Sequence, residues 1–350
     1  MIAIPACMAG SRDRSLTTIG DSFPLSAATL HHPKSAAILA LGHPDVSRNL
    51  RLRAPANSHF AISCRLVPCL LVLLATCVNS AVGQGENQPR RLTFDGRQKQ
   101  DPVFINQGRE IIYAVQHEKP RLVLYRLRLS DGHTERLHPD SPLPEFRPVY
   151  SRDEATFAYL QMTGNDRLTV QVRRVGMPQP LVVKPTAAVI WHAELTPDGQ
   201  HLLYAASGQL RMYPLSGGTE HTLTKTEGRN NWPSVSPNGR QVAFGSSRLG
   251  NYDLFTLDLD QKTTRRLTTN RSMDARPTWS PDGKQIAFVS TRHRNYELYL
   301  IGRDGNGLTR VTQNPERDDY PAWHPDGRHL VSVSQRDGQT DLFLHSISPR

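Results

Sequence analysis

The fold is decided by the stretch PTWSPDGKQIAF at residues 277–288, which recurs along the chain. Closely similar segments are PSVSPNG at 233–239, PAWHPDG at 321–327 and AELTPDG at 193–199. Two diverged copies, PVFINQG at 102–108 and PVYSRDE at 148–154, precede them. The first positions of the copies are 46, 45, 40, 44 and 44 residues apart, which is the period of a four-stranded propeller blade. The sequence therefore predicts six copies of one supersecondary unit.

Each copy contains four segments with the composition of β-strands. In the best-preserved copy these are residues 278–280, 285–289, 296–301 and 308–312, separated by turns such as Pro-Asp-Gly at 281–283. Proline fixes φ in such a turn and glycine adopts a positive φ. No long helical period interrupts the repeats, so we expect an all-β fold, a six-bladed β-propeller of four-stranded blades.

The last repeat supplies only three strands before the chain ends. In other repeats the fourth strand carries a Leu-Thr pair whose leucine lies ten residues before the next motif, as Leu267 lies before Pro277. Leu92 of the segment Arg-Leu-Thr at 91–93 lies ten residues before Pro102. We therefore expect this N-terminal strand to join the last blade and close the ring, which removes exposed sheet edges.

Charge and cysteines divide the chain near Gly83. The 350 residues include 42 Lys or Arg and 32 Asp or Glu, a formal charge of +10. Residues 1–83 hold 7 basic and 3 acidic residues, which leaves 35 − 29 = +6 on residues 84–350. All four cysteines lie in the first part, so residues 84–350 contain no disulfide framework, Cys-ligated zinc site or cysteine nucleophile. We assign residues 84–350 to the propeller.

An apolar run at 66–78 follows Arg65 and is followed by small residues up to Gly83. This pattern is typical of a secretory signal peptide, which we place at 65–83 with cleavage before Gln84. A retained membrane anchor is less favoured because a spanning helix needs about 20 apolar residues, and a buried cytosolic helix is the third interpretation. The expected location is the periplasm or another site outside the cytoplasm.

The 64 residues before the signal peptide show no sustained strand or helix period. We interpret residues 1–64 as an unstructured leader or as an extension that results from a wrongly assigned start of translation. The segment LATC at 74–77 is similar to a bacterial lipobox, although Thr76 departs from the usual small residue. Lipidation at Cys77 is therefore the minority interpretation.

The motif Pro-x-Trp-Ser-Pro-Asp-Gly-Lys-x-Ile-Ala-Phe resembles the repeat of TolB-type propellers, the WD40-like PD40 group. The resemblance covers residues 90–350 and implies a secreted six-bladed propeller. In that family an α/β domain precedes the propeller, the extreme N-terminus engages an inner-membrane partner, and the propeller holds a peptidoglycan-associated lipoprotein. The few residues between Gln84 and Arg90 leave no space for such a domain, so the resemblance implies a role carried by the propeller alone.

Residues 84–350 lack the common catalytic and cofactor motifs. There is no Gly-x-Ser-x-Gly nucleophile elbow, His-Glu-x-x-His helix or phosphate-binding loop. The ten histidines of this region are scattered among repeats with no shared position, so we predict no metal ligands, no catalytic residues and no cofactor. The alternative is a propeller enzyme, either a lyase or lactonase or one associated with a hydrolase, that acts on an acidic carbohydrate at the channel mouth.

A partner is expected to bind the face formed by loops that enter the first strand and loops between the second and third strands, because loops on rigid scaffolds carry recognition. The candidate residues are Arg147, Arg229, Asp274, Arg276, Arg292, His293, Asp318 and Asp319. The arginine excess favours an acidic partner, either an envelope protein or lipoprotein or, as the alternative, an acidic polysaccharide. Nucleic acid is disfavoured as a partner, and contact with a membrane is expected only through a retained leader or a lipidated Cys77.

The motif tryptophans Trp279 and Trp323 are predicted to pack between blades.

Overall fold

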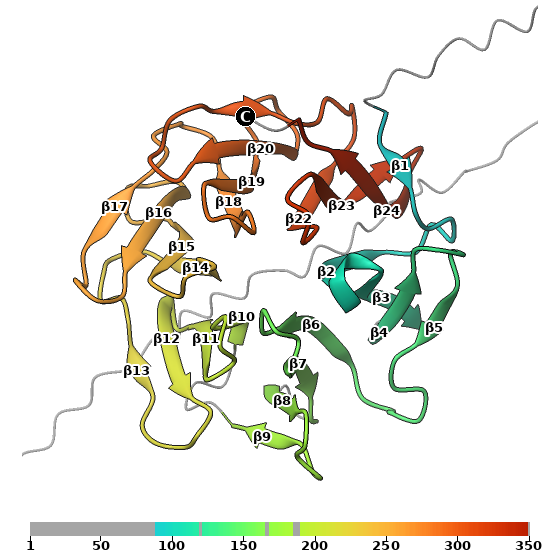
Figure 1. The fold of residues 1–350 in the computed structure, drawn as a ribbon. Helices are drawn as coiled ribbons and strands as arrows, with labels where there is room; N and C mark the ends of the chain where they lie inside the picture. The colour runs from blue at the N-terminus through green and yellow to red at the C-terminus, as the bar shows by residue number, and fades with distance from the viewer. Residues whose placement is uncertain (1–87, 119–120, 165–167, 185–189, 349–350) are drawn as a thin grey trace, which may run out of the picture. The chain divides into compact units, whose positions relative to one another are not determined.

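The computed structural model describes residues 88–118, 121–164, 168–184 and 190–348. The predicted leader at 1–64, the signal peptide at 65–83 and Cys77 lie outside the described residues. The described part is a ring of six four-stranded antiparallel sheets, which confirms the predicted six-bladed β-propeller (Figure 1). One 3₁₀ turn, η1 (Asn106–Gly108), accompanies the strands. No described helix has the length and apolar character needed to cross a membrane.

The first three blades follow the chain order of their strands. Blade 1 contains β2 (Lys99–Ile105), β3 (Glu110–Glu118), β4 (Arg121–Arg128) and β5 (Thr134–Arg136). Blade 2 contains β6 (Glu145–Tyr150), β7 (Thr156–Met162), β8 (Leu168–Arg174) and β9 (Leu181–Val183). Blade 3 contains β10 (Ile190–Leu195), β11 (His201–Ala206), β12 (Gln209–Pro214) and β13 (His221–Thr222).

The last three blades include the one that joins the two ends of the described chain. Blade 4 contains β14 (Asn230–Val235), β15 (Gln241–Ser246), β16 (Asp253–Asp258) and β17 (Thr264–Arg266). Blade 5 contains β18 (Asp274–Trp279), β19 (Gln285–Ser290), β20 (Glu297–Gly302) and β21 (Thr309–Arg310). Blade 6 contains β22 (Asp318–Trp323), β23 (His329–Arg336) and β24 (Gln339–Ser346), and its fourth strand is β1 (Arg90–Arg91).

The N-terminal strand β1 pairs antiparallel with β24, with Arg90 opposite Leu344 and Arg91 opposite Phe343. The backbone N–H of Leu92 also donates to the carbonyl of Leu342 at 2.8 Å. The ring is therefore closed by one strand from the front of the propeller and three from its end.

The first strand of each blade lies innermost, and these six strands contact one another around the centre (Figure 1). The motif aromatic residue near the end of this strand packs against the preceding blade. Trp279 Nε1 of blade 5 donates to the Ser234 carbonyl of blade 4 at 3.2 Å, and Trp323 of blade 6 donates in the same way to Thr278 of blade 5. The predicted packing of both tryptophans between blades is confirmed.

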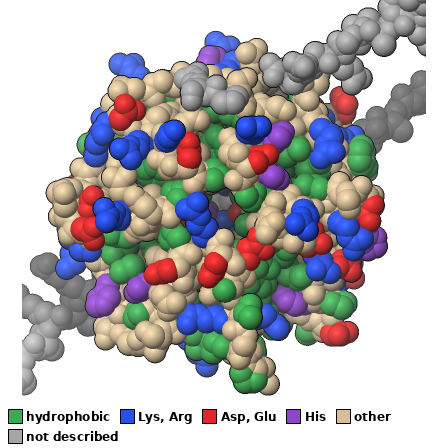
Figure 2. All heavy atoms as spheres, in the orientation of Figure 1, with side chains coloured by type: hydrophobic (Ala, Val, Ile, Leu, Met, Phe, Trp, Pro, Cys, Tyr) green, Lys and Arg blue, Asp and Glu red, His purple; other side chains and the backbone are tan. Residues whose placement is uncertain are grey.

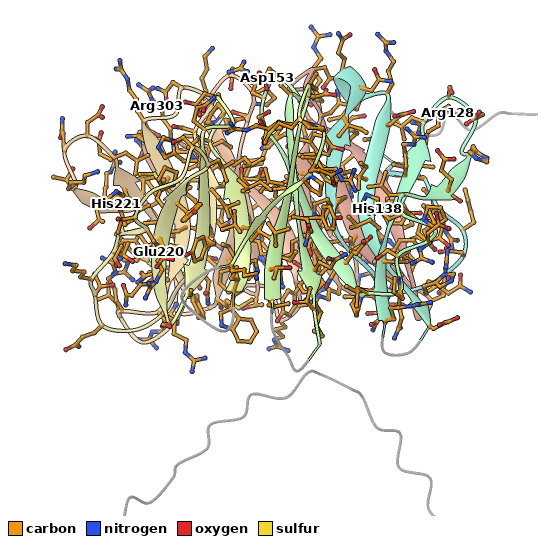
Figure 3. The ribbon with its side chains drawn as sticks, turned by 90° about the horizontal axis from the view of Figure 1, so that it is seen from below. Arg128, His138, Asp153, Glu220, His221 and Arg303 are labelled. Carbon is orange, nitrogen blue, oxygen red and sulfur yellow. The ribbon has the colours of Figure 1, made fainter. Side chains whose placement is uncertain are left out.

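In blade 5 the turn after the innermost strand is fixed by two side chains of the Ser-Pro-Asp-Gly motif. Ser280 Oγ donates to Asp282 Oδ1 at 2.6 Å and accepts the N–H of Gln285 at 3.0 Å. The same carboxylate accepts the N–H of Lys284 at 3.0 Å. Gly283 has φ +69°, which is the region that glycine adopts without strain. The turns that follow the innermost strands form one edge of the ring, where the labelled Asp153 lies in the side view (Figure 3).

The observed innermost strands begin earlier than the sequence predicts. The predicted segment 278–280 corresponds to β18, which starts at Asp274 and ends at Trp279. The pairing of β18 with β19 shifts register between Ala275 and Thr278, which marks a β-bulge. A bulge interrupts the local alternation of side chains. Regular periodicity in the sequence therefore does not predict the start of the strand.

Candidate functional site

Five innermost strands carry a bulge at the residue directly before the first position of the motif, whereas in β10 the register shifts one residue earlier, between Ile190 and His192. Five of the six residues at this place have a left-handed backbone, with φ between 51° and 56°. Large side chains with positive φ are uncommon and cost backbone energy. The six residues, here called the bulge ring, are Asp101, Arg147, His192, Trp232, Arg276 and Tyr320.

The bulge ring lines a central cavity of ≈ 470 Å³, a size typical of binding pockets. The opening at the centre of the propeller is visible in Figure 2, with charged side chains of both signs around it. Prolines of the motif turns line the same cavity, among them Pro237, Pro281 and Pro325. The cavity therefore extends from the bulge ring to the edge formed by the turns.

Both arginines of the bulge ring are already paired with carboxylates. Arg147 Nη1 lies 3.0 Å from Asp101 Oδ1, and Arg276 Nη1 lies 3.1 Å from Asp319 Oδ1. The Arg276 guanidinium also stands 4.4 Å from the ring centroid of Tyr320, in a cation–π arrangement. Positive and negative charges balance within these contacts, so the ring presents polar groups without a large net charge.

Several buried polar atoms of the ring have no hydrogen-bond partner among the described residues. These atoms are Asp101 Oδ2, His192 Nδ1 and Nε2, Trp232 Nε1 and Arg276 Nε. Buried donors and acceptors in native proteins are nearly always paired with protein, water or ligand. Their concentration around one cavity indicates a place where a bound group can be recognised by hydrogen bonds.

Burial also shifts the protonation of this ring. Burial, with the nearby charges of Arg147 and Arg276, holds the pKa of His192 well below its ordinary value, so the imidazole is neutral. Burial raises the pKa of Asp101, and the same two arginines oppose the shift. Burial lowers the pKa of Arg276, but the charges of Asp319 and its other acidic neighbours together outweigh burial, and the net pKa is raised.

A second group of side chains lines the cavity two residues further along each innermost strand. They are Val103, Val149, Glu194, Ser234, Thr278 and Ala322. Glu194 is the only ionisable member, and burial raises its pKa to about 8, against an opposing backbone hydrogen bond with Val235. At neutral pH its carboxyl is mainly protonated, and it can donate a hydrogen bond into the cavity.

Six of the eight residues predicted for the partner-binding face are held in ion pairs inside or between blades, Arg147 and Arg276 among them. Arg292 Nη2 donates to both oxygens of Asp274, at 2.9 and 3.0 Å, and Asp274 is 0% exposed. Asp318 accepts from Ser334 and lies 3.5 Å from Arg336. Asp319 pairs with Arg276 as described above.

The predicted face is therefore only partly assembled. Arg147 and Arg276 come together in the bulge ring, whereas Arg229 and His293 are exposed side chains outside it. The Arg229 N–H donates to Ser247 Oγ at 2.9 Å, and His293 Nδ1 contacts the Tyr299 hydroxyl. A role for these residues in partner binding stays a prediction.

Sequence reasoning missed Asp101, His192, Glu194 and Trp232 as cavity residues. Asp101, His192 and Trp232 share one usable signal, the position directly before the first motif residue, which holds a polar or aromatic residue in the six repeats. A residue before proline is expected to be extended. The neighbouring residues in the sequence therefore did not predict that these side chains would surround one cavity.

Comparison with known proteins places this architecture in a family. The model of the TolB β-propeller domain, PD40, matches residues 176–349. This chain belongs to the TolB-type β-propellers. The structure of a protein of Agrobacterium tumefaciens described as TolB superposes on this TolB-type propeller with a TM-score of 0.59 at 20% identity, covering 74% of this chain and 94% of that one.

Two further proteins are similar to this chain in part of the sequence or in the fold. An oligogalacturonate lyase in complex with manganese superposes with a TM-score of 0.56 at 12% identity, covering 75% of this chain and 93% of that one, and thus shares the fold. Atu1656, an uncharacterised protein of Agrobacterium fabrum, is 33% identical over 82 residues. That match spans 22% of this chain and 28% of the relative.

Proposed function

We propose that this chain is an exported, non-catalytic protein-binding propeller, a TolB-like scaffold of the cell envelope. In this proposal the central cavity holds a segment of an envelope protein or lipoprotein. The observation that carries the proposal is the set of buried, unpartnered polar atoms on the bulge ring. A bound polypeptide supplies both donors and acceptors from its backbone, and so it can satisfy the mixed set that this ring offers.

The charge balance of the cavity defines the kind of segment it suits. Asp101 neutralises Arg147 and Asp319 neutralises Arg276, while His192 and Glu194 are held mainly neutral. A strongly acidic ligand would have to break two buried ion pairs. The cavity therefore favours a polar segment of low net charge, whereas the arginine excess of the sequence had favoured an acidic partner.

Export is the second part of the proposal and rests on the signal peptide predicted at 65–83. Cell fractionation and N-terminal sequencing of the mature protein test it. We expect a mature chain that starts near Gln84 in the periplasmic fraction. A cytoplasmic protein that retains residues 65–83 would contradict export without affecting the binding proposal.

Co-purification with a cavity-filling variant tests the binding proposal. Thr278 lines the cavity, and Thr278→Trp would occupy space that the partner needs. Thr264 is exposed on the outer strand β17, and Thr264→Trp is the matched control. We expect only Thr278→Trp to lose the co-purified envelope protein. The circular dichroism spectra of both variants should match that of the native protein. Equal recovery with both variants would reject the cavity as the binding site.

Glu194 favours the second candidate function, action on an acidic carbohydrate. A buried carboxyl with a pKa of about 8 can act as a general acid near neutral pH. Incubation with oligogalacturonate tests this candidate. Turnover that Glu194→Gln abolishes would favour the enzyme, and no turnover in either protein would reject this substrate.

A further inference from the structure

The motif turn of blade 6 differs from those of blades 4 and 5 at two positions. In blade 5 the turn uses Ser280 and Gln285 on either side of Asp282, and blade 4 uses Ser236, Asn238 and Gln241. Blade 6 carries His324 and His329 on either side of Asp326. Both changes introduce an imidazole next to the same carboxylate.

The three side chains place their ligand atoms close together. His324 Nδ1 lies 3.0 Å from Asp326 Oδ1, and His329 Nδ1 lies 2.7 Å from Asp326 Oδ2. One ligand atom from each of the three residues lies within 4.8 Å of the others. Tetrahedral Zn²⁺ with bonds of about 2.0–2.2 Å separates its ligand atoms by roughly 3.4 Å. Small side-chain rotations therefore suffice to admit an ion.

We propose that His324, Asp326 and His329 bind a divalent transition metal such as Zn²⁺. Two imidazoles and one carboxylate are ligands that suit zinc. Three protein ligands leave a fourth position for water or for a group of a bound molecule. The site goes beyond the proposed function, because neither the scaffold role nor the fold requires a metal.

A contact from blade 1 supports the orientation of His324. Its Nε2 lies 3.2 Å from the carbonyl oxygen of Gly108, so Nε2 donates and Nδ1 keeps a lone pair on the side of Asp326. Metal-binding histidines usually donate their second ring nitrogen to such an oxygen. The imidazole also packs edge-on against Phe104, with ring centroids 4.8 Å apart. The ring is therefore fixed before any metal arrives.

Gly108 is needed in this contact because any side chain there would collide with His324. A Cβ on Gly108 would lie 2.1 Å from His324 Nε2. In the structure His324 Nδ1 also accepts the N–H of Asp326 at 3.1 Å, and a metal would replace that hydrogen bond. The side chains of Asp326 and His329 are 34% and 36% exposed, which gives an ion access from solvent. Pro325 lines the central cavity, so a bound ion would lie beside its mouth.

Titration of Zn²⁺ into the full chain, without an affinity tag, tests the proposal by calorimetry. The variants His324→Ser, His329→Gln and Asp326→Asn each introduce the residue that another blade uses at the same position, so we expect them to fold. Loss of a ligand should weaken the zinc affinity of one site at least about tenfold, since even the loss of a residue that only supports a metal ligand has an effect of this size. His201→Gln is the matched control, since His201 occupies the position of His329 in blade 3, where Thr196 stands in place of His324.

A thermal readout separates this site from other histidines and from the cysteines of the chain. Zinc binding to the folded protein should raise the Tm of the native chain and of His201→Gln. The same concentration should raise the Tm of His324→Ser less. Equal zinc affinity and equal Tm shifts in the native chain and in both His324→Ser and His329→Gln would overturn the proposal.

Discussion

Arg91 in the N-terminal strand donates through Nη2 to Asp341 Oδ2 in the last strand at 2.5 Å, across a sequence separation of 250 residues. Thr93 Oγ1 donates to the other oxygen of Asp341 at 2.7 Å, and Lys99 Nζ lies 3.0 Å from that same oxygen. Asp341 is 1% exposed. One buried carboxylate thus links both ends of the propeller.

Replacing this carboxylate should destabilise the whole ring. Asp341→Ala removes the acceptor of Arg91 and Thr93 and leaves Lys99 Nζ, which is 0% exposed, with the more exposed Asp95 as its remaining carboxylate partner. Removing one member of a buried ion pair costs about 3–5 kcal/mol. We expect a Tm lower by about 10 °C for a domain of this size, measured by circular dichroism. Asp260→Ala, at an exposed turn, is the control and should change little. An unchanged Tm for Asp341→Ala would contradict the role of the ion pair in closure.

Gly108 and His324 should be energetically coupled. Gly108→Ala places a Cβ against His324 Nε2 and forces alanine to φ +84°. The backbone term alone costs about 1–2 kcal/mol. In a double-mutant cycle measured by urea unfolding, His324→Ser should relieve the clash but not the backbone strain. Strictly additive free energies of unfolding would show that the two residues do not interact.

Asp274 should tolerate asparagine better than alanine. Blade 4 has Asn230 at the equivalent position, where Arg248 Nη2 donates to its Oδ1 at 3.2 Å. Asp274→Asn keeps an acceptor for Arg292, whereas Asp274→Ala leaves that guanidinium buried without its anion. We expect a loss of about 3–5 kcal/mol for alanine and clearly less for asparagine. Equal losses in denaturant titrations would contradict this expectation, because a neutral acceptor at position 274 would then not replace the carboxylate.

Glu194 should make stability depend on pH above neutrality. Its pKa is about 8 in the folded protein and 4.5 ordinarily, so the folded state binds more protons between these values. Stability therefore falls as pH rises toward 8 and levels off above it. Between pH 7 and 9 the Tm of the native protein should fall relative to that of Glu194→Gln, which does not titrate. Parallel Tm curves for the two proteins would contradict the raised pKa.

The sequence predicted the repeat architecture because each blade encodes its own turns. The Ser-Pro-Asp-Gly turn is determined by residues within five positions, as the contacts of Ser280 and Asp282 show. Closure was also predictable, since Arg91 and Thr93 belong to the same short pattern as Arg266 and Thr268 in blade 4. Arg266 pairs with Asp253 there as Arg91 pairs with Asp341.

The cavity could not be predicted in the same way. Its lining depends on bulges that hold residues such as Trp232 and Arg276 at positive φ, against their local preference. The pairing of Arg276 with Asp319 joins residues of two adjacent blades, so no single repeat contains it. Some of the charged residues that the sequence suggested for partner binding consequently form ion pairs with one another.

Photo-crosslinking from inside the cavity tests the central claim most directly. A photoreactive amino acid at Thr278 reports on groups bound in the cavity, and the same residue at the exposed Thr264 reports on the outer surface. After irradiation of intact cells, we expect one envelope protein crosslinked specifically from position 278, through a polar segment that mass spectrometry can locate. Crosslinks from position 264 alone, or none from position 278 in exported protein, would contradict binding of a partner in the central cavity.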